Sequence, residues 1–166
     1  KNLEHFKKNI KIIRNKKNLG VAASANKAIK IAKGDYFIRI DADDYISSNT
    51  LNFLYSITEF YPKMFGIACD YALIKGEDRQ IKELSSKDNP ISCGILYNRK
   101  KFINYGMYNP KFRHREEEEL RIRLGSKYTI YNLNLPLYRY SVHNDNKTKS
   151  KNYLIDFKKK IEKISS

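Results

Sequence analysis

The stretch GDYFIRIDADDYIS (residues 34–47) decides the fold expected for this chain, because it joins a hydrophobic strand to a cluster of acids. Residues 35–40 read as a strand, since they are rich in aromatic and β-branched side chains. Three carboxylates follow within four positions, those of Asp41, Asp43 and Asp44. Ligands of α/β proteins bind beyond the carboxyl ends of strands, so the sequence predicts a functional acidic loop here.

The composition is that of a globular domain with a strong positive charge. The chain has 166 residues, of which 41% are hydrophobic and 31% charged, and its net charge is +15. It has no apolar run of the roughly 18 residues that a membrane-spanning helix needs. Its two cysteines, Cys69 and Cys93, form no CxxC pair, so we expect a cytoplasmic protein without a disulfide framework or a zinc site. The positive charge attracts polyanions, but lysine-rich codon usage explains it equally well.

The first half of the chain alternates between apolar segments and segments with helical spacing. Their order is strand 9–15, helix 18–34, strand 35–40, helix 47–62 and strand 64–74. Such alternation predicts right-handed crossovers and a mostly parallel sheet. We therefore expect an α/β, Rossmann-like fold in which helices flank the sheet.

The second half is less regular. It is predicted to contain a polar loop at 75–90, a strand and short helix within 91–106, a helix at 115–126, and two strands at 127–133 and 136–143. Residues 150–166 place apolar side chains at helical spacing with lysines between them, which indicates a basic amphipathic helix. Such a helix usually packs on its own domain. The alternative is that it lies on a membrane surface as a peripheral contact.

The acids of DADD stand too close together to remain uncompensated, because neighbouring carboxylates repel one another. Mg²⁺ typically takes one or two protein carboxylates and completes its shell with water and substrate phosphates. The spacing therefore fits a site for a metal and a diphosphate. The alternative is a solvated acidic turn that caps the helix beginning near Ser47, since D-x-D is a short and common pattern.

Several segments, in their order along the chain, resemble family 2 glycosyltransferases of the GT-A fold. NLGVAASAN (18–26) contains a turn that leads into a helix N-terminus, which favours anions, and AKGDYFIRIDADD (32–44) follows it. GILYNRKKFINYGMYNPKF (94–112), REEEELRIRL (115–124) and PLYRYSVHNDNKT (136–148) resemble later segments of the family. The resemblance covers roughly residues 6–149. It implies an inverting transfer of a sugar from a nucleoside diphosphate sugar, a UDP-sugar above all, to an acceptor hydroxyl.

The resemblance also implies which residues hold the donor. Asn18, Gly20, Asn26, Asp41 and Asp43 are implied to bind the nucleotide sugar. They match the family's donor-side segments.

A divalent metal, Mn²⁺ or Mg²⁺, is implied on the diphosphate. Its implied ligand is Asp43, while Asp44 supports the loop or a water ligand. His143 matches the family's C-terminal histidine, which completes the metal shell in some members. The alternative for His143 is an exposed loop histidine.

The catalytic base is expected on the REEEEL helix. The resemblance aligns Glu116 and Glu117 with the family's Glu-Asp pair and favours Glu117, the second member. A helix N-terminus favours a carboxylate, so we expect Glu117 to be ionised near neutral pH. Because Glu replaces Asp there, Glu116 stays a rival. Glu118 and Glu119 are expected to lie on a solvated face, where Glu119 forms an ordinary ion pair four residues apart.

The predicted organisation is a glycosyltransferase domain at 1–149 followed by the helix at 150–166. Within the domain, about 1–75 would bind the nucleotide and about 76–149 would face a glycan or lipid-linked acceptor. The family normally begins with a strand-helix-strand unit that this sequence lacks, so the fold is expected to be N-terminally incomplete and the isolated chain a poor enzyme. An open sheet edge beside strand 9–15 would promote self-association. Family members commonly assemble cell-surface polysaccharides or lipid-linked glycans, which would place this chain in the cytoplasm or on the inner face of the membrane.

Three other readings remain open from the sequence. A nucleotidyltransferase could share the fold but would need a Gly-rich N-terminal loop, which is missing here. A basic nucleic-acid-binding protein would fit the net charge of +15 and the 13 tyrosines. Because no known nucleic-acid-binding signature is present, no specific nucleic acid is expected as a partner. The third reading is a non-catalytic remnant or binding module of the same fold.

Overall fold

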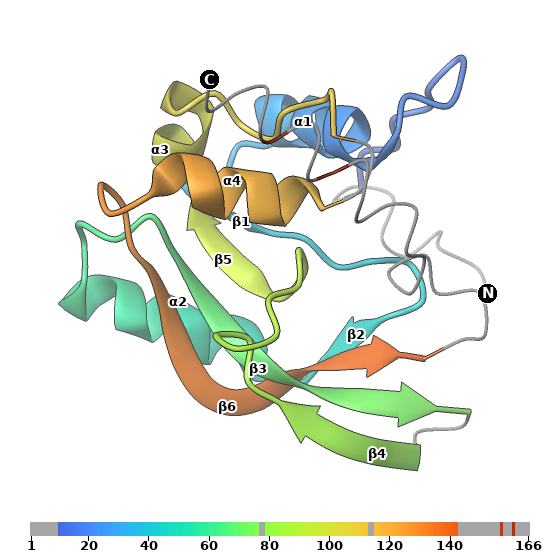
Figure 1. Ribbon diagram of the computed structural model, residues 1–166, viewed down its shortest axis with the longest axis vertical. Coiled ribbons are helices and arrows are strands. Elements are labelled where there is room, and N and C mark those ends of the chain that lie inside the picture. Colours follow the sequence, from blue (N-terminus) through green and yellow to red (C-terminus); the bar gives the residue numbers. More distant parts are fainter. Residues whose placement is uncertain (1–9, 77–78, 113–114, 143–156, 158–160, 162–166) are drawn as a thin grey trace.

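The alternation of strands and helices forms one six-stranded sheet with helices on both faces (Figure 1). The computed structural model describes residues 10–76, 79–112, 115–142, 157 and 161. The elements in chain order are α1 (Val21–Ile31), β1 (Tyr36–Ile38), β2 (Tyr45–Ile46), α2 (Thr50–Phe60), β3 (Gly66–Lys75), β4 (Arg79–Leu84), β5 (Ile95–Asn98), α3 (Arg99–Asn104), α4 (Glu116–Leu124) and β6 (Ile130–Ser141).

The helices form where apolar or small side chains recur every three or four residues. Their buried positions follow this spacing, with Ala22, Asn26 and Ile29 in α1 and Thr50, Leu54 and Thr58 in α2. The helices predicted at 18–34, 47–62 and 115–126 are therefore confirmed with shorter bounds. The short helix predicted within 91–106 is α3.

The sheet is built around β3, and its order is β1-β5-β3-β6-β2, with β4 paired to the second half of β3. The prediction of a mostly parallel sheet is wrong, because β3 and β6 form the one parallel pair among the described strands. The reason is the position of β5. It lies between β1 and β3 and runs antiparallel to both.

Two segments that were predicted as separate strands, 127–133 and 136–143, form the single strand β6. The strand passes through Pro136, which lies opposite Asp70 where the register of the β3–β6 pair shifts. Proline has no backbone N–H, so it is tolerated in a strand at such an irregularity. Figure 1 shows β6 bending strongly along its length, which curls the sheet.

The polar segment 75–90, predicted as a loop, contains the strand β4. It pairs antiparallel with β3 after a turn that includes Gly76, whose φ of 63° suits glycine. Most of β4 is exposed, and a strand exposed on both faces has no hydrophobic alternation to reveal it.

The segment predicted as strand 9–15 has no strand in its described part, residues 10–15. Ile10, Ile12 and Ile13 are 44%, 72% and 38% exposed there, so an apolar run without a partner strand stays outside the sheet. The prediction of an open sheet edge beside this segment is therefore wrong. Along the main order of described strands, β1 and β2 are the outermost strands.

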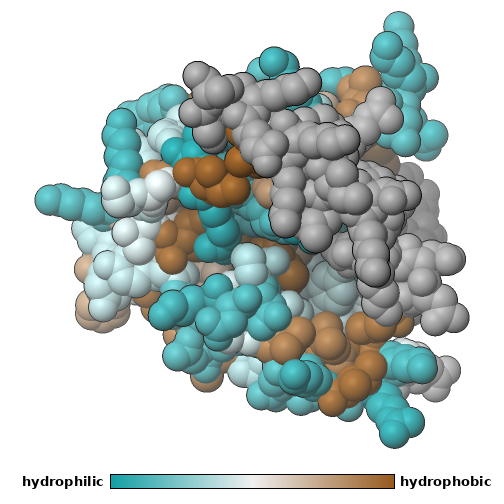
Figure 2. Space-filling view, viewed as in Figure 1, coloured by the Kyte–Doolittle hydropathy of each residue, from teal (hydrophilic) through white to brown (hydrophobic). Residues whose placement is uncertain are grey.

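The two faces of the sheet carry two hydrophobic cores. On one face, α1, α3 and α4 pack on alternate strand residues such as Ala68 and Ile95. On the other face, α2 packs through Leu54 on their neighbours, including Ile67 and Leu96. Figure 2 shows further hydrophobic side chains gathered where β2, β3 and β6 lie in Figure 1. This two-sided packing fixes the end of β1, which leads to the acidic loop, and α4, which carries the glutamates.

The helix predicted over 150–166 lies almost wholly outside the described residues. Phe157 is described there, and it is buried. Its ring packs against that of Phe112 at 5.7 Å, and the guanidinium of Arg115 lies over it at 5.8 Å.

Candidate functional site

The acidic loop follows β1 and is held by β6. A turn is closed by the backbone N–H of Asp44, which donates to the carbonyl of Asp41 at 3.1 Å. The hydroxyl of Tyr138 accepts a hydrogen bond from the backbone N–H of Asp41 at 3.3 Å and donates one to Asp44 Oδ2 at 2.7 Å. Tyr138 is fully buried, so β6 gives the loop a fixed shape.

The three carboxylates of the loop differ in their surroundings. Asp44 also accepts a hydrogen bond from the backbone N–H of Ser141 at 2.8 Å, so both of its oxygens are bonded to β6. Burial raises the pKa of Asp44, and these two hydrogen bonds oppose that rise. Asp43 is exposed, and its carbonyl accepts from the hydroxyl of Ser141. Asp44 thus anchors the loop, while Asp43 lies on its solvent side.

One group among the described residues could hold a metal ion, and it consists of Asp41, Asp44 and Cys93, whose candidate ligand atoms lie within 4.8 Å of one another. Burial raises the pKa of the Cys93 thiol to about 12, so the thiol is neutral near pH 7. Mg²⁺ and Mn²⁺ prefer oxygen ligands. The two carboxylates fit such an ion, and the neutral thiol does not. The predicted ligand Asp43 is outside this group, and His143 lies outside the described residues.

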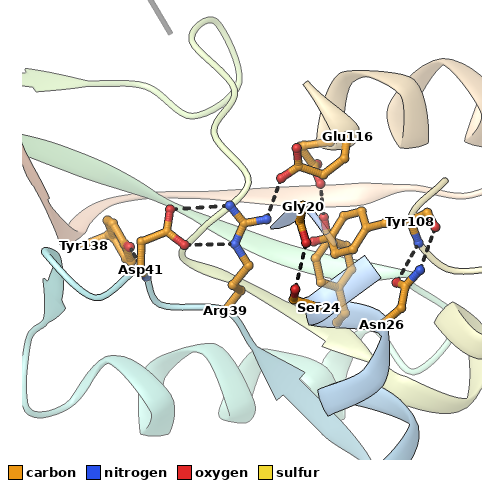
Figure 3. A network of polar contacts seen from close by, with 10 residues as sticks. Gly20, Ser24, Asn26, Arg39, Asp41, Tyr108, Glu116 and Tyr138 are labelled. Carbon is orange, nitrogen blue, oxygen red and sulfur yellow. Dashed lines mark hydrogen bonds and ion pairs between the residues drawn. The ribbon is translucent and has the colours of Figure 1, made fainter. Parts of the chain in front are cut away.

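Arg39 joins the acidic loop to α4 (Figure 3). Its Nε and Nη2 lie 3.1 and 3.4 Å from the two carboxylate oxygens of Asp41. Its Nη1 lies 2.6 Å from Oε1 of Glu116, the first residue of α4. Sequence reasoning missed Arg39. Its signal was a charged side chain within the apolar run YFIRI.

The two candidate bases occupy different environments. Glu116 is 4% exposed and reaches the acidic loop through Arg39. Glu117 is 2% exposed and accepts a hydrogen bond of 2.5 Å from the hydroxyl of Tyr97 inside the core. The structure therefore brings Glu116, and not Glu117, to the loop that carries Asp41.

Glu117 has a strongly perturbed carboxyl. Burial raises its pKa to about 7, against the opposing effects of Arg121 and Tyr97. Loss of hydration therefore opposes the expected effect of the helix N-terminus, and a pKa of about 7 leaves Glu117 only partly ionised near neutral pH. Arg121 Nε and Glu117 Oε1 form an ion pair at 2.8 Å. The N–H of Arg121 does not point at this oxygen, so both atoms lack a hydrogen-bond partner among the described residues.

The rest of the acidic run is structural. Glu119 pairs with Arg123 at 2.8 Å, as its spacing predicts, but it is 2% exposed. The expectation that it lies on a solvated face is wrong, since Arg123 also binds the carbonyls of Tyr105 and Met107 and closes this region. Glu118 is partly exposed and pairs with Arg115 at 2.7 Å.

The predicted anion-binding turn precedes α1. Gly20 has a φ of 80°, and its backbone N–H donates to Oδ1 of Asn18 at 2.9 Å. Asn26, by contrast, is 9% exposed and clamps the backbone of Tyr108, donating to its carbonyl at 2.8 Å and accepting from its N–H at 3.2 Å. The turn therefore stands at the start of α1, while the side chain of Asn26 fixes the segment before α4. Contact of these residues with a nucleotide stays a prediction.

Comparison with known proteins decides the family. The sequence model of glycosyl transferase family 2 matches residues 1–116, more than half of the chain. The chain belongs to glycosyl transferase family 2. The match includes the turn at Gly20, the acidic loop and the first residue of α4.

The chain is also similar to a curated protein and to a solved structure. An uncharacterized glycosyltransferase of Methanocaldococcus jannaschii is 26% identical over 92% of this chain and 56% of its own length. S. aureus TarS 1–349 superimposes with a TM-score of 0.66 at 16% identity, covering 84% of this chain and 46% of TarS 1–349. The same protein in complex with UDP-GlcNAc gives a TM-score of 0.69 at 16% identity, covering 89% and 47%. The chain thus spans about half the length of these relatives.

The superposition confirms the predicted GT-A-like α/β fold for this family 2 chain, with the mixed sheet described above. Among the described residues, no helix combines the length and hydrophobicity needed to cross a membrane.

Proposed function

We propose that this chain carries donor-binding and catalytic residues of an inverting glycosyltransferase that uses a UDP-sugar. The observation that carries the proposal is the link from Asp41 through Arg39 to Glu116, which joins an acidic loop at the end of a strand to a second carboxylate on α4. Membership of glycosyl transferase family 2 supports the reaction class. The TarS complexes with UDP and UDP-GlcNAc support a UDP-sugar as the donor.

On the donor side, Asp41 and Asp43 would hold the diphosphate end of the UDP-sugar together with Mn²⁺ or Mg²⁺. When bound, such an ion supplies Lewis-acid stabilisation of the leaving diphosphate. Asp44 keeps the loop in shape through its bonds to Tyr138 and Ser141. The turn at Gly20 would offer its backbone to an anionic group of the donor.

On the acceptor side, we assign the base to Glu116. Its carboxylate would take the proton of the acceptor hydroxyl while the hydroxyl oxygen forms a bond to the anomeric carbon. The bond from that carbon to the diphosphate oxygen breaks, and its electron pair leaves with UDP. Attack from the face opposite the leaving group inverts the configuration. Glu117 is a weaker candidate, because it is buried against Tyr97.

The finer setting is proposed from the family resemblance. Residues of about 76–149 would face a glycan or lipid-linked acceptor, in the assembly of a cell-surface polysaccharide or a lipid-linked glycan. The reaction would take place in the cytoplasm or on the inner face of the membrane. The net charge of +15 supports contact with an anionic surface.

A second candidate function is a non-catalytic module that binds a nucleotide sugar. It is favoured by the burial of the carboxylate of Glu116, which is 5% exposed and forms an ion pair with Arg39 through Oε1. A base must reach its acceptor, so this ion pair would have to open during turnover. Binding of donor without transfer would favour the module over the enzyme.

The test is a calorimetric screen of UDP-sugars against the full-length gene product, with Mn²⁺ or with EDTA, followed by assay of each bound donor for release of UDP. The proposed function predicts Mn²⁺-dependent binding of at least one UDP-sugar and release of UDP in the presence of an acceptor. Binding without release supports the module. Absence of binding with every donor contradicts both functions.

A further inference from the structure

We propose that Arg39 is a positioning residue that makes donor binding and the base depend on each other. Its guanidinium bridges Asp41 of the acidic loop and Glu116 of α4, and so sets the separation of the two carboxylates. This inference rests on the proposed function, and it adds a residue to which the family resemblance gives no role.

The geometry of the bridge uses the shape of the guanidinium. The edge formed by Nε and Nη2 faces both oxygens of Asp41, and Nη1 faces Oε1 of Glu116 (Figure 3). A planar fork can serve two carboxylates at once, whereas an ammonium group is a point charge that cannot reproduce this geometry. Lysine at position 39 would therefore keep the charge and lose the bridge.

The bridge is shielded from solvent on the side of α4. The side chains of Arg39 and Glu116 are 15% and 5% exposed, whereas that of Asp41 is 45% exposed. Ion pairs at exposed sites contribute little because water and salt screen them, but a pair this buried is coupled strongly, and removal of one partner leaves the other without compensation. The exposed side of Asp41 stays available to a ligand.

The backbone of Arg39 is fixed as well as its side chain. The carbonyl of Arg39 accepts a hydrogen bond of 3.1 Å from the backbone N–H of Gly94, which leads into β5. Gly94 has a φ of 70°, and a Cβ added there would lie 3.0 Å from the ring of Tyr138. The close approach of Gly94 to Tyr138 therefore locks the strand end from which the guanidinium projects.

The Arg39 guanidinium lies between two carboxylates, those of Asp41 and Glu116. Burial lowers the pKa of the Arg39 guanidinium, but the carboxylates of Asp41 and Glu116 raise it, so Arg39 stays charged. One cation between two carboxylates leaves the bridge with one net negative charge. Removal of the negative charge of Glu116 leaves Arg39 facing Asp41 alone, and Arg39 then competes more strongly with any cationic ligand of Asp41.

This competition gives the test, which is a double-mutant cycle on the affinity for UDP with Mn²⁺. The affinity is measured by calorimetry for the parent, Glu116→Gln, Arg39→Lys and the double variant. Glu116→Gln should weaken binding by at least about threefold in the parent, and by clearly less in the Arg39→Lys background, because coupled residues show such interaction energies. A merely structural ion pair would change stability without changing this coupling.

The matched control is the pair of Glu119 and Arg123, which also lies on α4 and also joins a buried carboxylate to a guanidinium. The effect of Glu119→Gln on UDP affinity should be the same in the parent and in the Arg123→Lys variant. Urea unfolding shows which variants are folded. If the Arg39→Lys variant does not fold, Arg39→Gln is used in its place. An equal effect of Glu116→Gln in both Arg39 backgrounds overturns the positioning role alone. Absence of Mn²⁺-dependent UDP binding by the parent overturns the proposed function and this role with it.

Discussion

Arg39 Nη1 and Glu116 Oε1 meet at 2.6 Å, which joins two residues that are 77 positions apart in the sequence. The contact brings the end of β1 against the first turn of α4. The packing of α1, α3 and α4 on one face of the sheet makes this contact possible. The acidic loop and the proposed base are therefore parts of one polar network.

The assignment of the base predicts unequal effects of two neighbouring substitutions. Glu116→Gln in the full-length gene product should weaken UDP-sugar binding only severalfold but reduce transfer by about two to four orders of magnitude, the usual contribution of a general base. Glu117→Gln is the matched control. It keeps a hydrogen-bond acceptor for Tyr97, so transfer should fall far less. Rates of UDP release measure both, and a larger loss for Glu117→Gln would move the role to Glu117.

The raised pKa of Glu117 predicts a pH dependence of stability. In the unfolded chain this carboxyl ionises near its ordinary value of 4.5, whereas in the folded protein its pKa is about 7 because it is buried. The folded state therefore binds more protons between these values, and its stability falls as pH rises through this window. The shift corresponds to about 3 kcal/mol.

Glu117→Gln should remove this dependence, since glutamine does not titrate. Urea unfolding of parent and variant at pH 4.5 and pH 7.5 measures it as the change in their stability difference. The free energy of unfolding of the variant, relative to that of the parent, should rise by about 2–3 kcal/mol between these pH values. A stability difference that is the same at both pH values would show that Glu117 ionises normally.

The clamp made by Asn26 predicts a loss of stability. Asn26→Ala would leave the backbone N–H and carbonyl of Tyr108 without their side-chain partners in a buried place. Each unsatisfied buried group costs about 1–3 kcal/mol, so the free energy of unfolding should fall by at least 1 kcal/mol. The control is Lys30→Ala on the exposed face of the same helix, which should stay within about 0.5 kcal/mol of the parent. Equal stability of the two variants would contradict the structural role of Asn26.

Local patterns predicted the helices well, because their signals lie within one segment. The buried residues of α1 and α2 recur every three or four positions, and such spacing is visible without any tertiary contact. The position of the acidic loop after β1 was also visible, since a strand of apolar residues ends where the carboxylates begin. These features located the acidic loop of the candidate site.

Features that depend on distant partners were mispredicted. The insertion of β5 between β1 and β3 made the sheet mixed, and no local pattern records which strands become neighbours. Glu119 was expected on a solvated face, yet it is buried because Arg123 gives it a partner inside the fold. Glu117, a candidate base, is buried against Tyr97. Arg39 left a signal, as a charge within an apolar strand, but its partner on α4 became evident only from the fold.

The central claim is that the acidic loop binds a nucleotide diphosphate through a divalent metal. Its most direct test is calorimetric titration of UDP into the full-length gene product, with Mn²⁺ and with EDTA, for the parent, Asp43→Ala and the control Asp35→Ala. Asp35 is an exposed acid at the opposite end of β1. The account predicts Mn²⁺-dependent binding by the parent and by Asp35→Ala, and loss of that binding in Asp43→Ala with unchanged unfolding. Equal affinity of the parent and Asp43→Ala, with the same dependence on Mn²⁺, would contradict it.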